Sequence, residues 1–148
     1  MDLLADHITH YRRDAEEFDY FEEPSPLNRD ASRRIRQAVM REARLPNSGL
    51  VLDAGSGNGW LTEALHGTEC LVVSVDLGLR NLERIRRERP DALCVCADLY
   101  RLPFRNASFD RVVCSEVLEH ANDPEAVVAA CAAVLKPGGR LTVSTPYR

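Results

Sequence analysis

The sequence predicts an α/β protein in which helices cover both faces of a parallel sheet. Two observations lead to this prediction. From residue 47 onward, short apolar runs typical of buried strands alternate with segments of helical apolar spacing. A glycine-rich turn directly follows the first of these runs. Strands joined by crossover helices lie parallel with right-handed connections, so we expect a three-layer α/β/α sandwich.

The expected strands are short and apolar, and the first, at residues 50–52, runs straight into the glycine-rich turn. The second ends at Asp76 and the third at Asp98, so an acidic residue closes each of them. The five expected strands lie at residues 50–52, 71–75, 93–97, 111–114 and 141–144.

The expected helices are bounded by residues that start or stop a helix. The first crossover helix spans about residues 60–66, and Gly67 can adopt the left-handed conformation that ends it. Pro90 stops the next helix, and Asp123 with Pro124 supplies the N-cap and first residue of the last one. We expect buried helix faces at Leu79, Leu82 and Ile85, and at Val127, Val128, Cys131, Val134 and Leu135, and a turn at residues 136–139 before the last strand.

The chain divides at about Pro46. Residues 1–46 form a polar helical lead-in or lid, with a helix expected near residues 30–43, and residues 47–148 form the ligand-binding core. Three aromatic residues of the lead-in are interpreted as helix-packing groups, with a lid over the ligand as the alternative: Tyr11, Tyr20 and Phe21.

Composition limits the classes of function. The 148 residues are 45% hydrophobic and 28% charged, which suits one domain with a real core. The net charge of -4 gives nucleic acid no general attraction, and we interpret the arginine clusters at residues 29–44 and 80–89 as solvated helix faces, with a basic substrate or RNA surface as the alternative. No apolar run is long enough to span a membrane, and the first residues lack a signal-peptide layout, so we expect a cytoplasmic protein.

The cysteines indicate neither a disulfide framework nor a metal site. They are odd in number, five, and include no Cys-x-x-Cys pair. Cys94 and Cys96 would share one face of a strand, where we interpret them as buried small hydrophobic groups rather than metal ligands.

The polar residues that follow the strands describe an adenosine site. In a sheet of this kind the ligand lies outside the carboxyl ends of the strands, where the strand order reverses. Glycines 55, 57 and 59 let the backbone approach a ligand closely. Asp76 can accept hydrogen bonds from both ribose hydroxyls, and Asp98 can reach the exocyclic amine of adenine while the backbone N–H of Leu99 reaches its ring nitrogen.

The same loop argues against a phosphate-bearing cofactor. It reads Gly-x-Gly-x-Gly, not the Gly-x-Gly-x-x-Gly of nicotinamide cofactors, and no lysine follows it as in a phosphate loop. Asp53 would repel a pyrophosphate. An acidic pocket suits a cofactor with a positive sulfonium and no phosphate, which is S-adenosylmethionine.

The chain resembles the class I S-adenosylmethionine-dependent methyltransferases, and most of all the small-molecule subgroup typified by quinone-biosynthesis methyltransferases. The resemblance covers residues 48–146. It rests on an ordered set of segments: 51–59, Val75-Asp76, 97–99 with 102–104, 108–113, Glu116-Val117-Leu118-Glu119-His120 and 135–139.

The resemblance implies a Rossmann-like fold and a role for each matched residue. Asp53, Gly55 and Gly57 would line the methionine end of the cofactor, with Asp76 at the ribose. Cys114 and Ser115 would form the floor near the methyl group. The full set of expected cofactor-binding residues is Asp53, Ala54, Gly55, Gly57, Asp76, Leu77, Asp98, Leu99, Cys114 and Ser115.

Catalysis needs little from side chains, because the sulfonium is already a strong electrophile and alignment supplies much of the acceleration. A general base matters only for an acceptor that must lose a proton, such as a phenol or catechol hydroxyl. The candidates are Glu116, Glu119 and His120, and for His120 a structural role in the turn is the alternative. Three hypotheses stay open: a methyltransferase with a small-molecule acceptor, a non-catalytic cofactor-binding or partner-docking module, and a nucleotide-cofactor oxidoreductase.

The family's sheet has seven strands, whereas this sequence stops just after the fifth. The fifth strand would then present an unpaired edge. We expect either an excerpt of a longer polypeptide or self-association through that edge, for example as a homodimer with Leu141 and Val143 at the contact.

Overall fold

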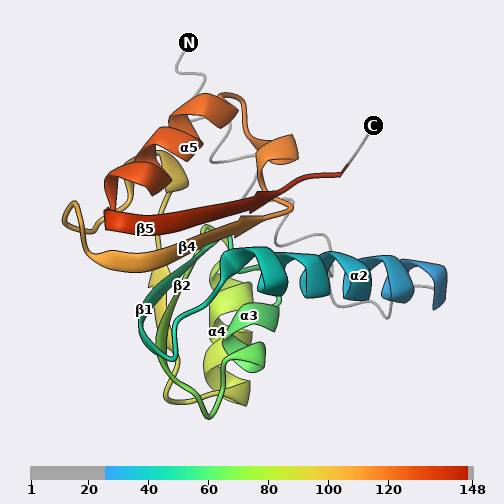
Figure 1. Ribbon diagram of the computed structural model, residues 1–148. Helices are drawn as coiled ribbons and strands as arrows, with labels where there is room; N and C mark the ends of the chain where they lie inside the picture. Colours follow the sequence, from blue (N-terminus) through green and yellow to red (C-terminus); the bar gives the residue numbers. More distant parts are fainter. Residues whose placement is uncertain (1–25, 147–148) are drawn as a thin grey trace.

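The computed structural model describes residues 26–146, which form five parallel strands and the helices that cover them (Figure 1). The strand order is β3-β2-β1-β4-β5 and every pairing is parallel. The order therefore reverses between β1 and β4, which is the switch point that the sequence predicts. The strands are β1 Ser48–Ala54, β2 Glu69–Asp76, β3 Leu93–Cys96, β4 Phe109–Ser115 and β5 Leu135–Ser144.

Helices lie on both faces of the sheet, as expected, with α5 on one side and α2, α3 and α4 on the other (Figure 1). Side-chain alternation along the strands creates two cores. Leu52 packs in the core under α5, whereas its neighbour Val51 packs in the core under α2 and α3. The helices are α2 Pro26–Ala43, α3 Trp60–Ala64, α4 Leu79–Glu88 and α5 Pro124–Ala133, with short 3-10 turns at Leu99–Arg101 (η1) and Leu118–His120 (η2).

The expected helix boundaries are largely confirmed. The Asp123 side chain accepts a hydrogen bond from the backbone N–H of Ala126 at 3.0 Å, and Pro124 begins α5. Helix α4 ends at Glu88, before Pro90, and Gly67 has a left-handed φ of 79° after α3. The lead-in helix is found at Pro26–Ala43, whereas the aromatic residues Tyr11, Tyr20 and Phe21 lie outside the described residues.

Four expectations are wrong in detail, and one concerns Leu135, which is not on the buried face of the last helix but begins β5 and is only half-buried. Leu79 is 62% exposed, because at about 100° per residue it lies about 120° around α4 from the buried Ile85. Cys96 is exposed and Cys94 only half-buried, because β3 is an edge of the described sheet, so the prediction of two buried thiols fails. Residues 136–139 do not precede the last strand but lie within β5, where the register with β4 jumps from Phe109↔Leu135 to Arg111↔Arg140.

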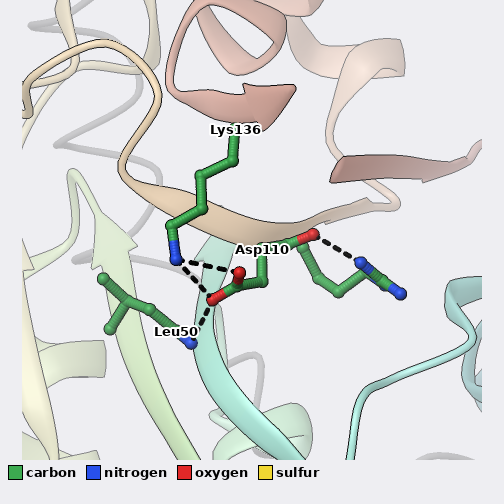
Figure 2. A network of polar contacts seen from close by, with 4 residues as sticks. Leu50, Asp110 and Lys136 are labelled. Atoms are coloured by element: carbon green, nitrogen blue, oxygen red, sulfur yellow. Dashed lines mark hydrogen bonds and ion pairs between the residues drawn. The ribbon is translucent and has the colours of Figure 1, made fainter. Parts of the chain in front are cut away.

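A polar contact ties together the amino ends of β1, β4 and β5 (Figure 2). Oδ2 of Asp110 accepts a hydrogen bond from the backbone N–H of Leu50 at 2.9 Å, and Lys136 Nζ lies 2.8 Å from Oδ1. The hydrogen bond from Lys136, then the one from Leu50, holds the pKa of Asp110 below its usual range. This group stabilises the end of the sheet opposite the carboxyl ends of the strands. Within residues 26–146, no helix is long and apolar enough to cross a membrane.

Candidate cofactor and acceptor pocket

A cavity of about 360 Å³ opens beyond the carboxyl ends of β1, β2 and β4. The loops that follow these strands form its base, and Ser32, Ile35 and Arg36 of α2 form part of its wall. Its position at the reversal of strand order is the one expected for a ligand in this kind of sheet. Nine of the residues singled out in the sequence line it: Gly55, Gly57, Asp76, Leu77, Asp98, Leu99, Ser115, Glu116 and His120.

The glycine-rich loop is held by β2. The backbone N–H groups of Gly55 and Ser56 both donate to the carbonyl oxygen of Val75, at 2.8 and 2.9 Å. Gly57 has a positive φ of 48°, and a Cβ placed on it would meet no atom of residues 26–146 within 4 Å apart from its chain neighbours. The loop thus presents bare backbone to the cavity, which a ligand can approach closely.

The Asp76 carboxylate organises this part of the pocket. Its Oδ2 accepts a hydrogen bond from the backbone N–H of Gly57 at 2.8 Å, and its Oδ1 accepts from the N–H of Gly78 at 2.7 Å and from Nδ2 of Asn81 at 3.2 Å. Asp76 is 7% exposed and lines the cavity. A carboxylate has about four acceptor positions, so these three bonds leave capacity for a ligand hydroxyl.

Asp98 and Leu99 lie beyond the end of β3. Oδ1 of Asp98 accepts a hydrogen bond from the backbone N–H of Tyr100 at 3.0 Å, which caps the η1 turn and fixes the orientation of the carboxylate. Asp98, Leu99 and Tyr100 all line the cavity. The turn therefore offers both an acidic group and an apolar surface to one end of the pocket.

Three of the expected cofactor-binding residues do not line the cavity. Asp53, Ala54 and Cys114 are at most 2% exposed, because β1 extends to Ala54 and β4 to Ser115, which keeps these side chains inside the sheet layers. Burial, together with the nearby charge of Asp76, raises the pKa of Asp53 to about 7. Oδ2 of Asp53 is buried and has no hydrogen-bond partner among the described residues.

The other side of the pocket is formed by the chain that follows β4. Ser115, Glu116 and His120 line it, whereas Glu119 does not. The side chain of Glu119 is 14% exposed, and its Oε1 lies 3.8 Å from Nε2 of His120. Its Oε2 is buried and finds no hydrogen-bond partner within residues 26–146.

Glu116 has an unusual backbone conformation. Its φ of 56° lies in the left-handed region, which costs a residue with a side chain about 1–2 kcal/mol. Such outliers persist where the surrounding structure fixes them, and they gather at functional sites. Glu116 lines the cavity, so the strained residue and the pocket coincide.

Several lining residues were not expected from the sequence, among them Ser56, Trp60 and the three residues of α2. Arg36 belongs to a cluster interpreted as a solvated face, yet it lines the cavity, and its guanidinium carbon lies 5.8 Å from the centre of the Trp60 ring. This distance is short enough for a cation–π contact. Arg36 is exposed, as the interpretation of a solvated face predicts, and it also borders the cavity. No group of three or more residues able to hold a metal occurs in residues 26–146.

The topology and the position of the cavity place the chain in the Rossmann-like class of α/β ligand-binding domains. A family model described as a methyltransferase domain matches residues 52–143, and the chain belongs to that family.

Curated relatives are methyltransferases of quinone biosynthesis. The chain is 42% identical over 113 residues to the ubiquinone biosynthesis O-methyltransferase of Xylella fastidiosa, which covers 71% of this chain and 45% of the relative. It is 41% identical over 104 residues to the enzyme of the same name from Idiomarina loihiensis. That match covers 66% of this chain and 42% of the relative. The chain thus spans less than half the length of these relatives.

Solved structures with the same fold include an S-adenosylmethionine-dependent methyltransferase from Mesorhizobium loti, at 29% identity and a TM-score of 0.66, with 74% of this chain and 51% of that one covered. The PH0226 protein of Pyrococcus horikoshii aligns with a TM-score of 0.72 at 22% identity, over 90% and 65% of the two chains. The [4+2]-cyclase SpnF aligns with a TM-score of 0.69 at 23% identity, over 77% and 44%. At these lower identities the likeness shows the fold alone.

Proposed function

We propose that the protein is an S-adenosylmethionine-dependent methyltransferase that acts on a small-molecule acceptor. The observation that carries this proposal is the Asp76 carboxylate bonded to the glycine loop, inside a pocket at the switch point of a methyltransferase-family domain. The donor set fits the cofactor, because it offers carboxylates and bare backbone and no cluster suited to phosphates.

Each part of the cofactor has a counterpart in the pocket. Asp76 would hold the ribose hydroxyls, and Asp98 with Leu99 would hold the adenine. Gly55 and Gly57 would border the methionine part. Among residues 26–146, Arg36 is the arginine that both lines the cavity and borders Trp60 beside the glycine loop, and we propose that it pairs with the cofactor's carboxylate. Asp53 and Cys114 lie beneath the residues that line the cavity. Asp53 would act on the cofactor through its charge, and Cys114 would support the pocket floor.

The bound cofactor supplies an electrophilic methyl group on a positively charged sulfur. What the chain adds is orientation, exclusion of water and, for a hydroxyl acceptor, removal of a proton. The relatives named as O-methyltransferases support an acceptor that is methylated on oxygen, and we propose a phenol or catechol hydroxyl. Glu116 and His120 line the acceptor side and are the candidates to receive that proton, and Glu119 would act through His120.

A second candidate is a protein that binds the cofactor without methyl transfer. The [4+2]-cyclase of the same fold supports keeping it, since the fold alone does not fix the reaction. An oxidoreductase is less well supported, because the loop lacks the nicotinamide pattern and Asp53 lies beneath it.

The test is calorimetric titration with S-adenosylmethionine, S-adenosylhomocysteine and NAD, followed by transfer of labelled methyl to catechol. We expect both sulfur compounds to bind, NAD to give no heat of binding, and catechol to be methylated. Binding without turnover on a panel of hydroxyl acceptors would favour the second candidate. Binding of NAD alone would overturn the proposal.

Two further predictions from the sequence remain proposals. Self-association through β5 is supported by its position at the edge of the described sheet, with Val143 38% exposed, and sedimentation over a concentration series tests it.

A cytoplasmic location is supported by the thiol content, since all five cysteines are free.

A further inference from the structure

Strands β4 and β5 end side by side at the acceptor side of the pocket (Figure 1). Their last residues, Ser115 and Ser144, are partners in the register of the sheet. Ser115 and the residue after it, Glu116, line the cavity, whereas Ser144 is not one of the lining residues. Ser144 can act on a ligand through these two neighbours, which it contacts.

Ser144 contacts both of these neighbours. Its carbonyl oxygen accepts a hydrogen bond from the backbone N–H of Glu116 at 2.9 Å, and its hydroxyl donates to Oε1 of Glu116 at 2.9 Å. The hydroxyl oxygens of Ser115 and Ser144 are 2.8 Å apart. A serine hydroxyl has one proton, and that of Ser144 is directed at the Glu116 carboxylate, so Ser115 is the donor in the contact between the two serines.

These contacts fix Glu116 at two levels. The bond from its N–H to the Ser144 carbonyl holds the left-handed backbone, whose φ is 56°. The bond to Oε1 sets the rotation of the carboxylate and occupies one of its oxygens. An ionised carboxylate keeps further acceptor capacity after one such bond, so Glu116 can still receive a hydrogen bond from a ligand in the cavity.

We infer that Ser144 is a positioning residue for the acceptor: its hydroxyl orients the Glu116 carboxylate, and through Ser115 the pocket floor, to receive a hydroxyl group. This inference rests on the proposed function, in which Glu116 faces the acceptor. A general base must lie within hydrogen-bond reach of the proton that it removes, and a carboxylate free to rotate spends less time in that position. The hydroxyl of Ser144 thus acts on turnover rather than on cofactor binding.

The test compares Ser144→Val with Ser144→Thr, which have the same shape and differ in the hydroxyl. Trp60, the one tryptophan of the chain, lines the cavity, so its fluorescence reports ligand binding. We expect S-adenosylhomocysteine to bind both variants as it binds the wild type. With catechol as acceptor, kcat should fall about 10- to 100-fold in Ser144→Val and recover in Ser144→Thr, while KM changes little.

A second measurement does not depend on the acceptor. The infrared band of the Glu116 carboxylate, identified by its loss in Glu116→Gln, should shift in Ser144→Val and stay in place in Ser144→Thr. An unmoved band in Ser144→Val, or equal loss of kcat in both variants, would overturn the inference. A wild-type protein that binds S-adenosylhomocysteine but does not methylate catechol would instead contradict the proposed acceptor class, and the infrared comparison would then decide the role of Ser144.

Discussion

Oδ2 of Asp76 lies 2.8 Å from the backbone nitrogen of Gly57 and accepts its hydrogen bond, so the residue expected to hold the ribose also orders the glycine loop. These two elements of the site are one unit. The loop backbone and the carboxylate that ends β2 are fixed relative to each other before a ligand arrives, which reduces the entropy lost on binding.

Replacing Asp76 should therefore weaken the cofactor site twice over. We expect Asp76→Ala to reduce the affinity for S-adenosylhomocysteine by about 10- to 100-fold, or about 1.5–3 kcal/mol, the scale of hydrogen bonds to a charged group. Calorimetric titration measures this. Asp91→Ala, at an exposed position, is the matched control. An unchanged affinity in Asp76→Ala would remove the ribose assignment.

Two glycines of the loop have different surroundings, because Gly57 borders the space open to a ligand and Gly59 packs against the core. Among the described residues other than its chain neighbours, a Cβ at Gly57 meets no atom within 4 Å, whereas a Cβ at Gly59 would lie 2.6 Å from Cγ1 of the buried Ile85. We expect Gly57→Val to keep the fold, at a cost of about 1–2 kcal/mol for a side chain at a φ of 48°, but to abolish cofactor binding, since its side chain enters the space open to the ligand. Gly59→Ala should lower the free energy of unfolding by about 1–3 kcal/mol through overpacking.

Circular dichroism and urea unfolding, combined with titration, distinguish these two outcomes. Gly57→Ala is a useful intermediate, because it adds one carbon at the same positive φ. If Gly57→Val binds the cofactor normally, the loop is only a turn, and the central motif of the site has been misinterpreted.

Much of this site could be predicted from the sequence, because its residues follow strands. The carboxyl ends of parallel strands meet at one edge, so Asp76, Asp98 and Ser115 had to lie near one another once the strands were recognised. Asp53 shows the limit of that argument. Its strand continues to Ala54, and residues 51–54 are all buried because both faces of β1 are covered, so this carboxylate lies under the pocket rather than in it.

The contribution of α2 could not be predicted in the same way. Helical periodicity indicates which residues of a helix share a face, but not which part of the fold that face meets. Arg36 therefore resembled its solvated neighbours in sequence, and only the packing of α2 against β4 and β5 brings it to the cavity. Ser144 was missed for a related reason, since its role depends on the register between two strands.

The contact between Asp110 and Lys136 gives a prediction about stability at acid pH. A carboxyl whose folded pKa is lowered contributes stability that is present above its unfolded pKa and lost as the pH falls through the folded value. We expect Asp110→Asn to lower the free energy of unfolding at pH 7 by about 0.5–1 kcal/mol, because it keeps an acceptor for Leu50 but loses the ion pair. Asp110→Ala, which loses both, should cost more, and urea unfolding at pH 3–7 should show a shallower acid loss in both variants than in the wild type.

The buried carboxyl of Asp53 predicts the opposite dependence on pH. Its pKa is raised from 3.8 to about 7 by burial, with the Asp76 charge as a lesser cause. The folded protein thus binds a proton that the unfolded chain releases, and stability from this group is full below about pH 4 and lost as the pH rises through 7. The loss is on the order of a few kcal/mol. Asp53→Asn, which carries no charge at any pH, should therefore gain stability relative to the wild type between pH 5 and pH 8.

Urea unfolding of both proteins across that range measures the difference directly, because titrating groups that are not coupled to Asp53 contribute equally to each and cancel. Asp91→Asn exchanges an exposed carboxyl for the same amide, and since it removes no buried charge, its difference from the wild type should not grow with pH. Bound S-adenosylmethionine adds a positive charge near the pocket and favours the ionised form of Asp53, so it should reduce the wild-type loss at high pH. A difference between Asp53→Asn and the wild type that stays constant from pH 5 to pH 8 would mean that Asp53 is already ionised in the folded protein, which would overturn the raised pKa.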